Sequence, residues 1–318
     1  MDKKLLFSIK ESELKTLLQV KYCKAQDNIR PTLKGMCFNA NNGQLETCCL
    51  DGYRVSKRVL ENIQINDSVN FVLDNESILK LYKTSQKNNN IVNIYMLNGY
   101  IEFEFINEII NCTLIDCNYI NYNQIIPQDK QELELNINAK EVLKAIKAIK
   151  ESGNQGYIKN NIIKLNIKND NLVIAAKPIK KEYSELESVK YQNERQHNYN
   201  NEFIIRHINW DKKVNKAIEK GKILTVKEPI KKIAKFQKVY LTSELDEVKV
   251  NIPCKIKRNN LEDNFEIGFN IKYMYEAIKL YKDNIIMKFN NSVSPCVITK
   301  DNKNLELILP VRLHMGNY

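Results

Sequence analysis

The tetrapeptide KLYK occurs twice in this chain, within ESILKLYKTSQK at residues 76–87 and within YEAIKLYKDNI at residues 275–285. Lys80 and Lys279 are 199 positions apart. Each copy lies in a helical pattern that follows an apolar run typical of a strand. Such a repeat in a lysine-rich chain arises by chance or by internal duplication, and the flanking segments decide between the two.

Two further pairs of segments favour a duplication. FNANNGQLETCC, which starts at Phe38, is similar to LNIKNDNLVIAA, which starts at Leu165, and each indicates a β-hairpin with an Asn/Gly/Asp turn. SELKTLL at 12–18 corresponds in the same way to KEVLKAI at 140–146. We therefore predict two copies of one α+β unit, in which short helices cover one face of antiparallel sheets.

The spacing of these pairs locates an insertion. The hairpins are 127 residues apart and the KLYK helices 199, so the second copy carries about 72 extra residues before its last helix. We predict one domain at 1–129 and a second at 130–318, with a basic insertion at about 190–246. The segment 206–238 has eleven Lys or Arg against three Asp or Glu. Within it we predict two short basic helices, at 210–222 and 227–238.

The composition is that of a packed globular protein. The 318 residues are 43% apolar, and no apolar run reaches the length of a membrane span or of a signal peptide. The eight cysteines form no C-x-x-C motif. We therefore expect a cytoplasmic protein with reduced cysteines and without a metal or other cofactor. The net charge of +11 favours a polyanionic partner, although a codon bias toward Lys and Asn also explains it.

Lysine is the shared feature of the exposed faces of three predicted helices. At 100° per residue the following lysines lie opposite the apolar positions: Lys80, Lys83, Lys87, Lys140, Lys144, Lys147, Lys272, Lys279 and Lys282. A solvated face explains any one helix. Because corresponding helices of both copies present lysine, the pattern favours a common surface that contacts phosphates without reading bases.

Four motifs in order resemble a known family: NIRPTLKGMCF…LDGYRVSKR, then LIDCNYINYNQIIP, then EIGFNIKYMYEAIKL…NSVSPCVI and LELILPVRL. They are similar to the middle and C-terminal domains of the bacterial DNA polymerase III beta subunit, the sliding clamp. We find no resemblance to that family's N-terminal domain, and none for the insertion. The resemblance implies a DNA-clamp fold of two clamp domains, each with antiparallel sheets and two helices.

The resemblance also implies a function. Members of the family are ring-shaped processivity factors that encircle duplex DNA, with helices lining the hole. The implied partners are double-stranded DNA, bound non-specifically, DNA polymerase and other proteins with clamp-binding peptides, and a clamp loader. The divergence points to a phage or plasmid replisome as the source. The family's rings contain six domain-sized units, so two units per chain favour a trimer over a dimer.

A peptide-binding pocket between the two domains is implied as well. Matched position by position, its residues are Gly52, Tyr53, Arg54, Val55, Ile120, Ile125, Asn270, Tyr273, Val293, Leu307, Leu309, Pro310, Val311 and Arg312, with Asp51 and Gln124 in the same segments. Such a groove suits a short hydrophobic peptide. Ile120 stands where the family has proline, and HMGNY extends past the usual C-terminus, so the partner preference stays open. Interdomain core is the alternative role for the apolar residues.

No catalytic motif is present. The chain has no G-x-x-x-x-G-K-[ST], no H-E-x-x-H and no G-x-S-x-G, and it has three histidines. We predict that it is not an enzyme. Two alternatives to the clamp remain. One is a clamp-like decoy or adaptor that binds replisome peptides without encircling DNA, and the other is a non-specific DNA-binding protein that acts through the insertion.

Overall fold

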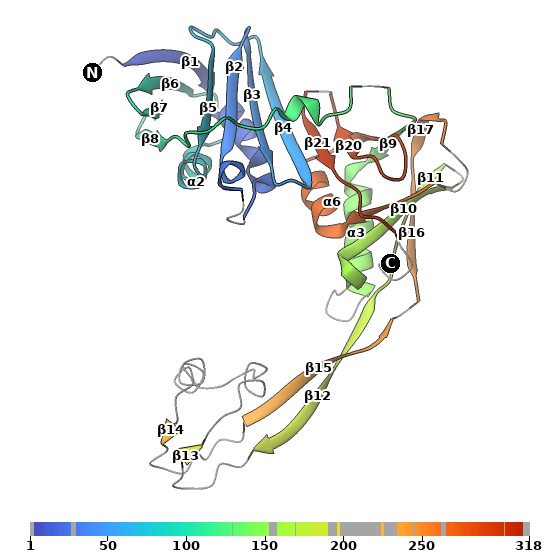
Figure 1. Ribbon diagram of the computed structural model, residues 1–318. Helices are drawn as coiled ribbons and strands as arrows, with labels where there is room; N and C mark the ends of the chain where they lie inside the picture. The colour runs from blue at the N-terminus through green and yellow to red at the C-terminus, as the bar shows by residue number, and fades with distance from the viewer. Residues whose placement is uncertain are drawn as a thin grey trace. The chain divides into compact units, whose positions relative to one another are not determined.

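The computed structural model divides the chain into two compact units (Figure 1). The larger, here called the body, comprises Met1–Ile149, Asn160–Ala176 and Glu247–Tyr318, and the small unit comprises Lys150–Lys159 and Lys177–Asp246. The structure describes residues 3–26, 30–128, 130–152, 158–168, 170–189, 196–197, 224–225, 234–244, 246–261, 265–301 and 303–313. For 179–189, 196–197, 224–225 and 234–244 only the backbone is described. Each unit is described by itself.

The first repeat of the body, residues 4–113, alternates strands with short helices. Its elements are β1 (Lys4–Lys10), α1 (Glu11–Leu17), the 3-10 helices η1 (Leu18–Cys23) and η2 (Pro31–Lys34), β2 (Met36–Asn41), β3 (Gln44–Leu50), β4 (Arg54–Glu61), β5 (Val69–Leu73), α2 (Asn75–Thr84), β6 (Ile91–Leu97), β7 (Tyr100–Glu104) and β8 (Ile109–Thr113). A linker with the 3-10 helix η3 (Tyr122–Gln124) follows.

The second repeat, residues 133–308 apart from the small unit, has the same order of α-helices and strands with one additional strand, β17. They are β9 (Leu133–Asn138), α3 (Ala139–Ser152), η5 (Lys159–Asn161), β10 (Ile162–Lys168), β11 (Asn171–Ala176), β16 (Val248–Pro253), β17 (Lys255–Asn259), β18 (Glu266–Asn270), α6 (Ile271–Ile278), β19 (Asn284–Phe289), β20 (Cys296–Thr299) and β21 (Leu305–Ile308).

The sheets show the duplication directly. The strand orders β1-β6-β7-β8 and β5-β2-β3-β4 of the first repeat return as β9-β19-β20-β21 and β18-β10-β11-β16 in the second, and the pairs are antiparallel. One nine-stranded sheet, β17-β9-β19-β20-β21-β4-β3-β2-β5, joins the repeats through the pairing of β21 with β4. The predicted α+β duplication is therefore confirmed.

The turns of the predicted hairpins are specified by their sequence. Asn42 and Gly43 connect β2 to β3 and have φ of 49° and 74°. Two consecutive positive φ values are what a two-residue hairpin turn needs, and Asn-Gly adopts them readily. The equivalent turn between β10 and β11 contains Asp170, with φ of 55°. Both hairpins lie where the sequence predicts them.

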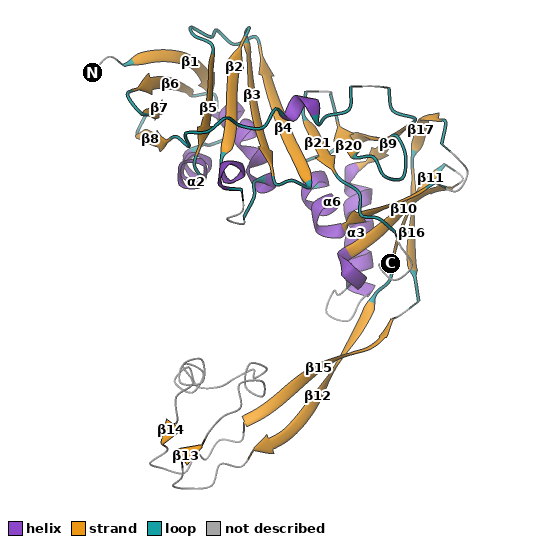
Figure 2. Ribbon diagram, in the orientation of Figure 1, coloured by secondary structure: helices purple, strands orange, loops and turns teal. Residues whose placement is uncertain are grey.

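The helices pack one apolar side against the sheets (Figure 2). Helix α3 buries Val142, Ala145, Ile146 and Ile149 on one side, as its spacing predicts. Burial of an isoleucine side chain contributes roughly 1.5–3 kcal/mol, so a charge at Ile146 would detach this helix. Helix α2 starts at Asp74, whose carboxylate accepts a hydrogen bond of 2.9 Å from the Ser77 N–H.

The boundary between the repeats has a core of its own. Val55 on β4 and Leu305 and Leu307 on β21 are buried there, together with Tyr122 and Ile126 of the linker. The linker thus closes over the junction of β4 and β21. This core holds the two repeats in one body, and it includes two candidate pocket residues, Val55 and Leu307.

The small unit contains an antiparallel ribbon of β12 (Ile179–Val189) and β15 (Ala234–Glu244), and a short pair of β13 (Gln196–His197) and β14 (Leu224–Thr225). The predicted helix at 227–238 is wrong for its last five residues, because β15 begins at Ala234. Residues 227–233 and the whole of the helix predicted at 210–222, Trp210 included, lie outside the described residues. In the first repeat, residues 51–53 alone join β3 to β4, whereas 177–247 join β11 to β16.

Candidate functional site

The predicted DNA-facing lysines are all exposed. Lys80 and Lys83 lie in α2, Lys272 lies in α6, and α3 carries Lys140, Lys144 and Lys147. The helices are shorter than the sequence pattern indicates. Helix α2 ends at Thr84 and α6 at Ile278, so Lys87, Lys279 and Lys282 follow the helices and do not lie in them.

Lysines of both repeats approach one another at the boundary. The pKa of Lys21 is lowered by burial and by the charges of Lys24, Lys15 and Lys279, the last of which belongs to the second repeat. The pKa of Lys15 is lowered by burial and by the charge of Lys87. Burial is the larger cause of both shifts, and the neighbouring charges add to it. Lys21 of the first repeat and Lys279 of the second therefore lie near each other at the boundary.

Two lysines that look scattered in the sequence converge on one ring. The Nζ atoms of Lys15 and Lys21 lie 3.7 and 4.2 Å from the centroid of the Tyr82 ring, and Lys15 also donates a hydrogen bond to the Tyr82 carbonyl. The sequence pattern leaves both out of the predicted surface. No spacing rule could include them, because Lys15 lies in α1 and Lys21 in the 3-10 helix η1, and both reach Tyr82 of α2 only in the folded body.

The second repeat gathers lysines at the start of α3 and the end of α6. The Ala139 N–H donates a hydrogen bond of 3.1 Å to the Asp283 carbonyl, and Figure 1 shows the two helices next to each other. The pKa of the Asp283 carboxyl is lowered by the hydrogen bond from Lys300 and also by the charges of Lys140 and Lys282. Two of the predicted phosphate-contacting lysines thus lie close enough to act on one carboxylate.

The turn before β4 is held by a buried arginine. Asp51 accepts hydrogen bonds from the N–H groups of Tyr53 and Arg54, at 3.0 and 3.1 Å, and from Nε of Arg54 at 2.8 Å. The other end of the Arg54 guanidinium donates to Glu276 of α6 at 2.5 Å and to the Tyr22 carbonyl at 3.3 Å. These partners belong to both repeats, so they fix the turn at the domain boundary.

The aromatic rings of Tyr53 and Tyr273 lie close to the side chain of Arg54. The Arg54 guanidinium lies 4.2 Å from the centroid of the Tyr273 ring, and the rings of Tyr53 and Tyr273 are 6.2 Å apart. The Leu309 N–H donates a hydrogen bond of 2.8 Å to the Tyr53 carbonyl. Tyr53 is nevertheless 58% exposed and Leu309 36%. The structure therefore brings four predicted pocket residues together, and two of them offer apolar surface to solvent.

Other predicted pocket residues have structural roles that the structure makes explicit. Val55 and Leu307 are opposite each other in the β4–β21 ladder and are buried, so they can form only the floor of a groove. Asn270 caps α6, with its side chain accepting from the Lys272 and Tyr273 N–H groups. Gly52 has φ of 90°, and a Cβ there would lie 1.9 Å from a guanidinium nitrogen of Arg30.

The remaining predicted pocket residues are at or near the surface. Ile120, Ile125 and Val293 are 45%, 39% and 66% exposed, Pro310 and Val311 are half-buried, and Arg312 is exposed. Nine large apolar side chains are exposed in the part of the chain with described side chains, and five of them are predicted pocket residues. Of these five, Tyr53 and Leu309 are joined by a backbone hydrogen bond.

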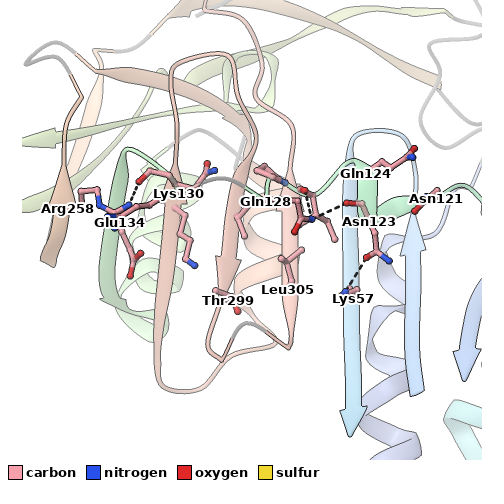
Figure 3. Close-up of a pocket in the computed structure, with 15 residues that line it drawn as sticks. Lys57, Asn121, Asn123, Gln124, Gln128, Lys130, Glu134, Arg258, Thr299 and Leu305 are labelled. Atoms are coloured by element: carbon pink, nitrogen blue, oxygen red, sulfur yellow. Dashed lines mark hydrogen bonds between the residues drawn. The ribbon is translucent and has the colours of Figure 1, made fainter. Parts of the chain in front are cut away.

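A polar cavity beside this region includes Gln124, which the sequence analysis names with the pocket segments. It measures about 900 Å³ and lies between the linker and the nine-stranded sheet (Figure 3). Its lining includes Lys57, Lys130, Glu134 and Arg258. In Figure 3 the Gln128 amide donates to the carbonyls of Asn123 and Ile126, at 3.2 and 3.0 Å. The linker residues of the lining lie in the motif LIDCNYINYNQIIP, whereas Lys57, Glu134 and Arg258 come from separate strands that no local motif connects.

The described residues show no metal-binding constellation and no membrane span. In the described ranges no three His, Cys, Asp or Glu side chains are placed to hold a metal ion. Nor does any helix there have the length and apolarity needed to cross a bilayer. All eight cysteines are free thiols, and burial raises the pKa of the six that are buried.

Comparisons with known proteins agree with the duplicated fold. Residues 8–121 match the family model described as DNA polymerase III beta subunit, central domain, and residues 200–312 match the model described as its C-terminal domain. The second match includes much of the range predicted as an insertion and starts well after residue 130. The predicted domain bounds remain a prediction.

Related proteins and solved structures are described as sliding clamps. The beta sliding clamp of Bacillus subtilis (strain 168) is 29% identical over 157 residues, which are 49% of this chain and 41% of the relative. That of Pseudomonas aeruginosa is 26% identical over 134 residues, 40% of this chain and 35% of the relative. The chain therefore spans less than half the length of these curated relatives.

Similarity of fold extends along almost the whole chain. The crystal structure of a DNA polymerase sliding clamp from Pseudomonas aeruginosa has a TM-score of 0.69 at 17% identity, covering 98% of this chain and 68% of that one. The one from Bacillus subtilis has a TM-score of 0.65 at 21% identity, covering 98% and 65%. With both family models matched in order, the chain belongs to the DNA polymerase III beta subunit family, the bacterial sliding clamps.

Proposed function

We propose that this protein is a DNA sliding clamp, a non-enzymatic processivity factor that encircles duplex DNA and tethers a replicative polymerase. Its two clamp domains are residues 1–129 and 130–318. The observation that carries the proposal is that the predicted lysines on and next to α2, α3 and α6 of both repeats are exposed, with Lys15 and Lys21 gathered at the Tyr82 ring of α2. Lysine contacts phosphate as a point charge, which suits a protein that must slide on any sequence.

Polymerase tethering is proposed for the surface around Tyr53. Exposed Tyr53 and Leu309 offer apolar contact area, while Arg54 is fixed below them by Asp51 and Glu276. An arrangement of this kind is preorganised, so a short hydrophobic peptide would lose little of its binding free energy to ordering the receptor. DNA polymerase, other proteins with clamp-binding peptides and a clamp loader are the proposed partners.

The proposed assembly is a ring of three chains. Two domains per chain turn the chain by about 120° in a ring of six similar units, so three chains close the circle and two leave a gap. The duplicated strand order supports such similar units, because each repeat presents the same sheets at its ends.

The decisive experiment compares processivity after lysine removal. Lys80, Lys83 and Lys279 are replaced together by Ala, and the matched control replaces Lys4, Lys168 and Lys255, which are exposed lysines on strands. Both variants lose the same charge. Primer extension on circular DNA, with the cognate polymerase and loader, should shorten markedly for the first variant and little for the control.

An unchanged product length for the first variant would remove the clamp proposal. The second candidate, a decoy or adaptor for replisome peptides, is favoured by the exposed apolar side chains alone. It predicts unchanged peptide binding together with no processivity in either the original chain or the variants. Deleting 190–246 tests the third alternative, since a protein that binds DNA through the insertion would lose all DNA affinity.

A further inference from the structure

The polar cavity between the linker and the nine-stranded sheet is distinct from the surface around Tyr53. Of the residues named for the peptide-binding pocket and its segments, only Gln124 is in its lining. Its volume of about 900 Å³ lies within the range of roughly 300–1,000 Å³ that is typical of small-molecule pockets. The body therefore contains a second concave site, which the proposed peptide surface does not use.

A row of charged side chains on three strands forms one end of this cavity. In the ladders of the sheet, Arg258 of β17 is opposite Glu134 of β9, and Glu134 is opposite Lys288 of β19. Directly opposite residues of neighbouring strands lie on the same face of a sheet. All three line the cavity, and all three are half-buried. The strand register thus places an arginine and a lysine on either side of one carboxylate.

The first repeat and the linker contribute two more cationic groups. Lys57 of β4 lines the cavity, and its Nζ atom is 3.2 Å from an oxygen of Glu46. Lys130 of the linker also lines the cavity and is exposed. Figure 3 shows Arg258 at one end and Lys57 at the other. The cavity therefore spans the boundary between the repeats.

Positive charge exceeds negative charge in the lining. Among the described lining residues four are cationic, whereas Glu134 is the one carboxylate. Glu134 is itself engaged by Lys257, at 3.2 Å. Within the part of the chain that the structure describes, neither Lys130 nor Arg258 forms an ion pair. Because like charges repel more strongly in a half-buried site than in water, an anion with several negative groups would be stabilised here.

The arginine and the linker beside it are fixed by hydrogen bonds within the chain. Nη1 of Arg258 donates to the Gln131 carbonyl at 2.7 Å, and the other N–H groups of the guanidinium remain for a ligand. The Gln128 amide donates to the carbonyls of Asn123 and Ile126, at 3.2 and 3.0 Å. A guanidinium held in this way presents its planar fork to a phosphate with little further ordering.

We propose that this cavity binds a nucleoside triphosphate, with the phosphate chain on Arg258, Lys288 and Lys130. Arginine suits phosphate as a fork and lysine as a point charge. A phosphate chain is smaller than the ligands for which cavities of this volume are typical. The exposed amides of Asn121 and Gln124 in the lining can donate to and accept from the edge of a base. This site does not depend on the proposed clamp function.

Calorimetric titration of the full chain with ATP at low salt tests the site. The cavity variant is Arg258→Gln/Lys288→Gln, and the matched control is Lys4→Gln/Lys168→Gln, which removes two exposed lysines from strands outside the cavity. Loss of two charged donors should weaken ATP binding by at least about tenfold. The control should stay within about twofold of the original chain, since exposed charges at a distance are screened. Absence of ATP binding by the original chain, or equal affinity in the two variants, would overturn the proposal.

A third variant keeps the test valid if the cavity variant folds poorly. Lys130 is exposed, so Lys130→Gln should leave the urea midpoint unchanged while weakening ATP binding by about threefold. Replacing Lys80, Lys83 and Lys279 by Ala should leave ATP affinity as in the original chain. Loss of ATP binding in this helix variant would place the nucleotide on the DNA-facing lysines and would remove the cavity site. Lost processivity with retained ATP binding bears on the clamp function and leaves the cavity site intact.

Inorganic triphosphate separates the phosphate chain from the nucleoside. It carries the same kind of charge without a base, so it should bind at least about fivefold more weakly than ATP if the linker amides contact the base. Amide hydrogen exchange of residues 121–131 should slow when ATP is added, because the linker forms part of the cavity. Equal affinity for both probes would overturn the nucleoside assignment, and unchanged exchange in the linker would show that ATP binds elsewhere.

Discussion

The guanidinium of Arg58 donates a hydrogen bond to the carboxylate of Glu306, with Nη2 and Oε1 2.5 Å apart, across the junction of β4 and β21. The two side chains are 3% and 0% exposed. The Tyr22 hydroxyl donates to the second carboxylate oxygen at 2.5 Å. A buried carboxylate with two strong donors links η1 of the first repeat to the last strand of the second, so it couples the two domains.

Removing one partner of this pair should destabilise the body strongly. Glu306→Gln leaves the Arg58 guanidinium buried without a counter-charge, and we expect a loss of about 3–5 kcal/mol in the free energy of unfolding. The double variant Arg58→Met/Glu306→Leu removes both charges and should lie closer to the original chain. Urea titration followed by circular dichroism measures both. A loss below about 1 kcal/mol in Glu306→Gln would show that the pair is dispensable.

Stability should fall as the solution becomes alkaline. Burial raises the pKa of the Cys37 and Cys112 thiols from 9.0 to about 12. Between these values the unfolded chain releases protons that the folded chain keeps, so each such thiol lowers the free energy of unfolding by about 1.4 kcal/mol per pH unit. The contribution is fully present below pH 9 and is lost as the pH rises toward 12.

Urea midpoints at pH 7.5, 8.5 and 9.5 test this expectation. They should stay level at first and then decline, and a Cys37→Val variant should decline less steeply. Lys15 and Lys21 act in the opposite direction, because their pKa values are lowered in the folded state. A midpoint that rises with pH would mean that these lysines outweigh the buried thiols.

The sequence predicts the fold well where local chemistry is decisive. Asn42-Gly43 specifies its hairpin by backbone preference alone, and the apolar spacing of α3 specifies its buried side. Both features are periodic or local, and the duplication doubles each signal. The ends of helices are harder to predict from the sequence. Lys279 continues the lysine spacing of α6, although the helix has already ended at Ile278.

The site is predicted less completely, for a physical reason. Tyr53 and Tyr273 are identified through motifs, but their anchors Tyr22 and Glu276 are not, since these residues act only through the folded contact with Arg54. The cavity lined by Lys57 and Arg258 is likewise assembled from distant strands. A contact between residues far apart in the chain leaves no spacing rule in a single sequence.

Peptide binding should depend on Tyr53 while folding does not. Its ring is 58% exposed, so Tyr53→Ala should change the free energy of unfolding by less than about 0.5 kcal/mol. Loss of an aromatic contact at the centre of an interface costs about 2 kcal/mol or more in binding. Fluorescence anisotropy with a labelled hydrophobic clamp-binding peptide should therefore show at least tenfold weaker affinity. Ile91→Ala, on a residue 49% exposed, is the control and should bind as the original chain does.

Salt dependence should report the lysines that contact phosphate. Each lysine that neutralises one phosphate contributes about −0.9 to the slope of log K against log salt concentration. Replacing Lys80, Lys83 and Lys279 by Ala should make the slope shallower by up to about 3, and the control set Lys4, Lys168 and Lys255 should leave it unchanged. The measurement is equilibrium binding to linear duplex DNA at several salt concentrations. Equal slopes in the two variants would place the DNA elsewhere on the protein.

The mass in solution tests the assembly most directly. In a head-to-tail ring, every chain that joins leaves one binding surface of each kind open until the ring closes, so only a closing number of chains is stable against further growth. Two domains per chain make that number three, and light scattering should give a mass of about three times the chain's 37.2 kDa. Dilution should yield monomers together with trimers and few dimers, because a dimer has one contact where the trimer has three. A stable dimer at all concentrations would mean that the second contact is isologous, and a ladder of growing species would mean that the rotation between domains does not close the circle.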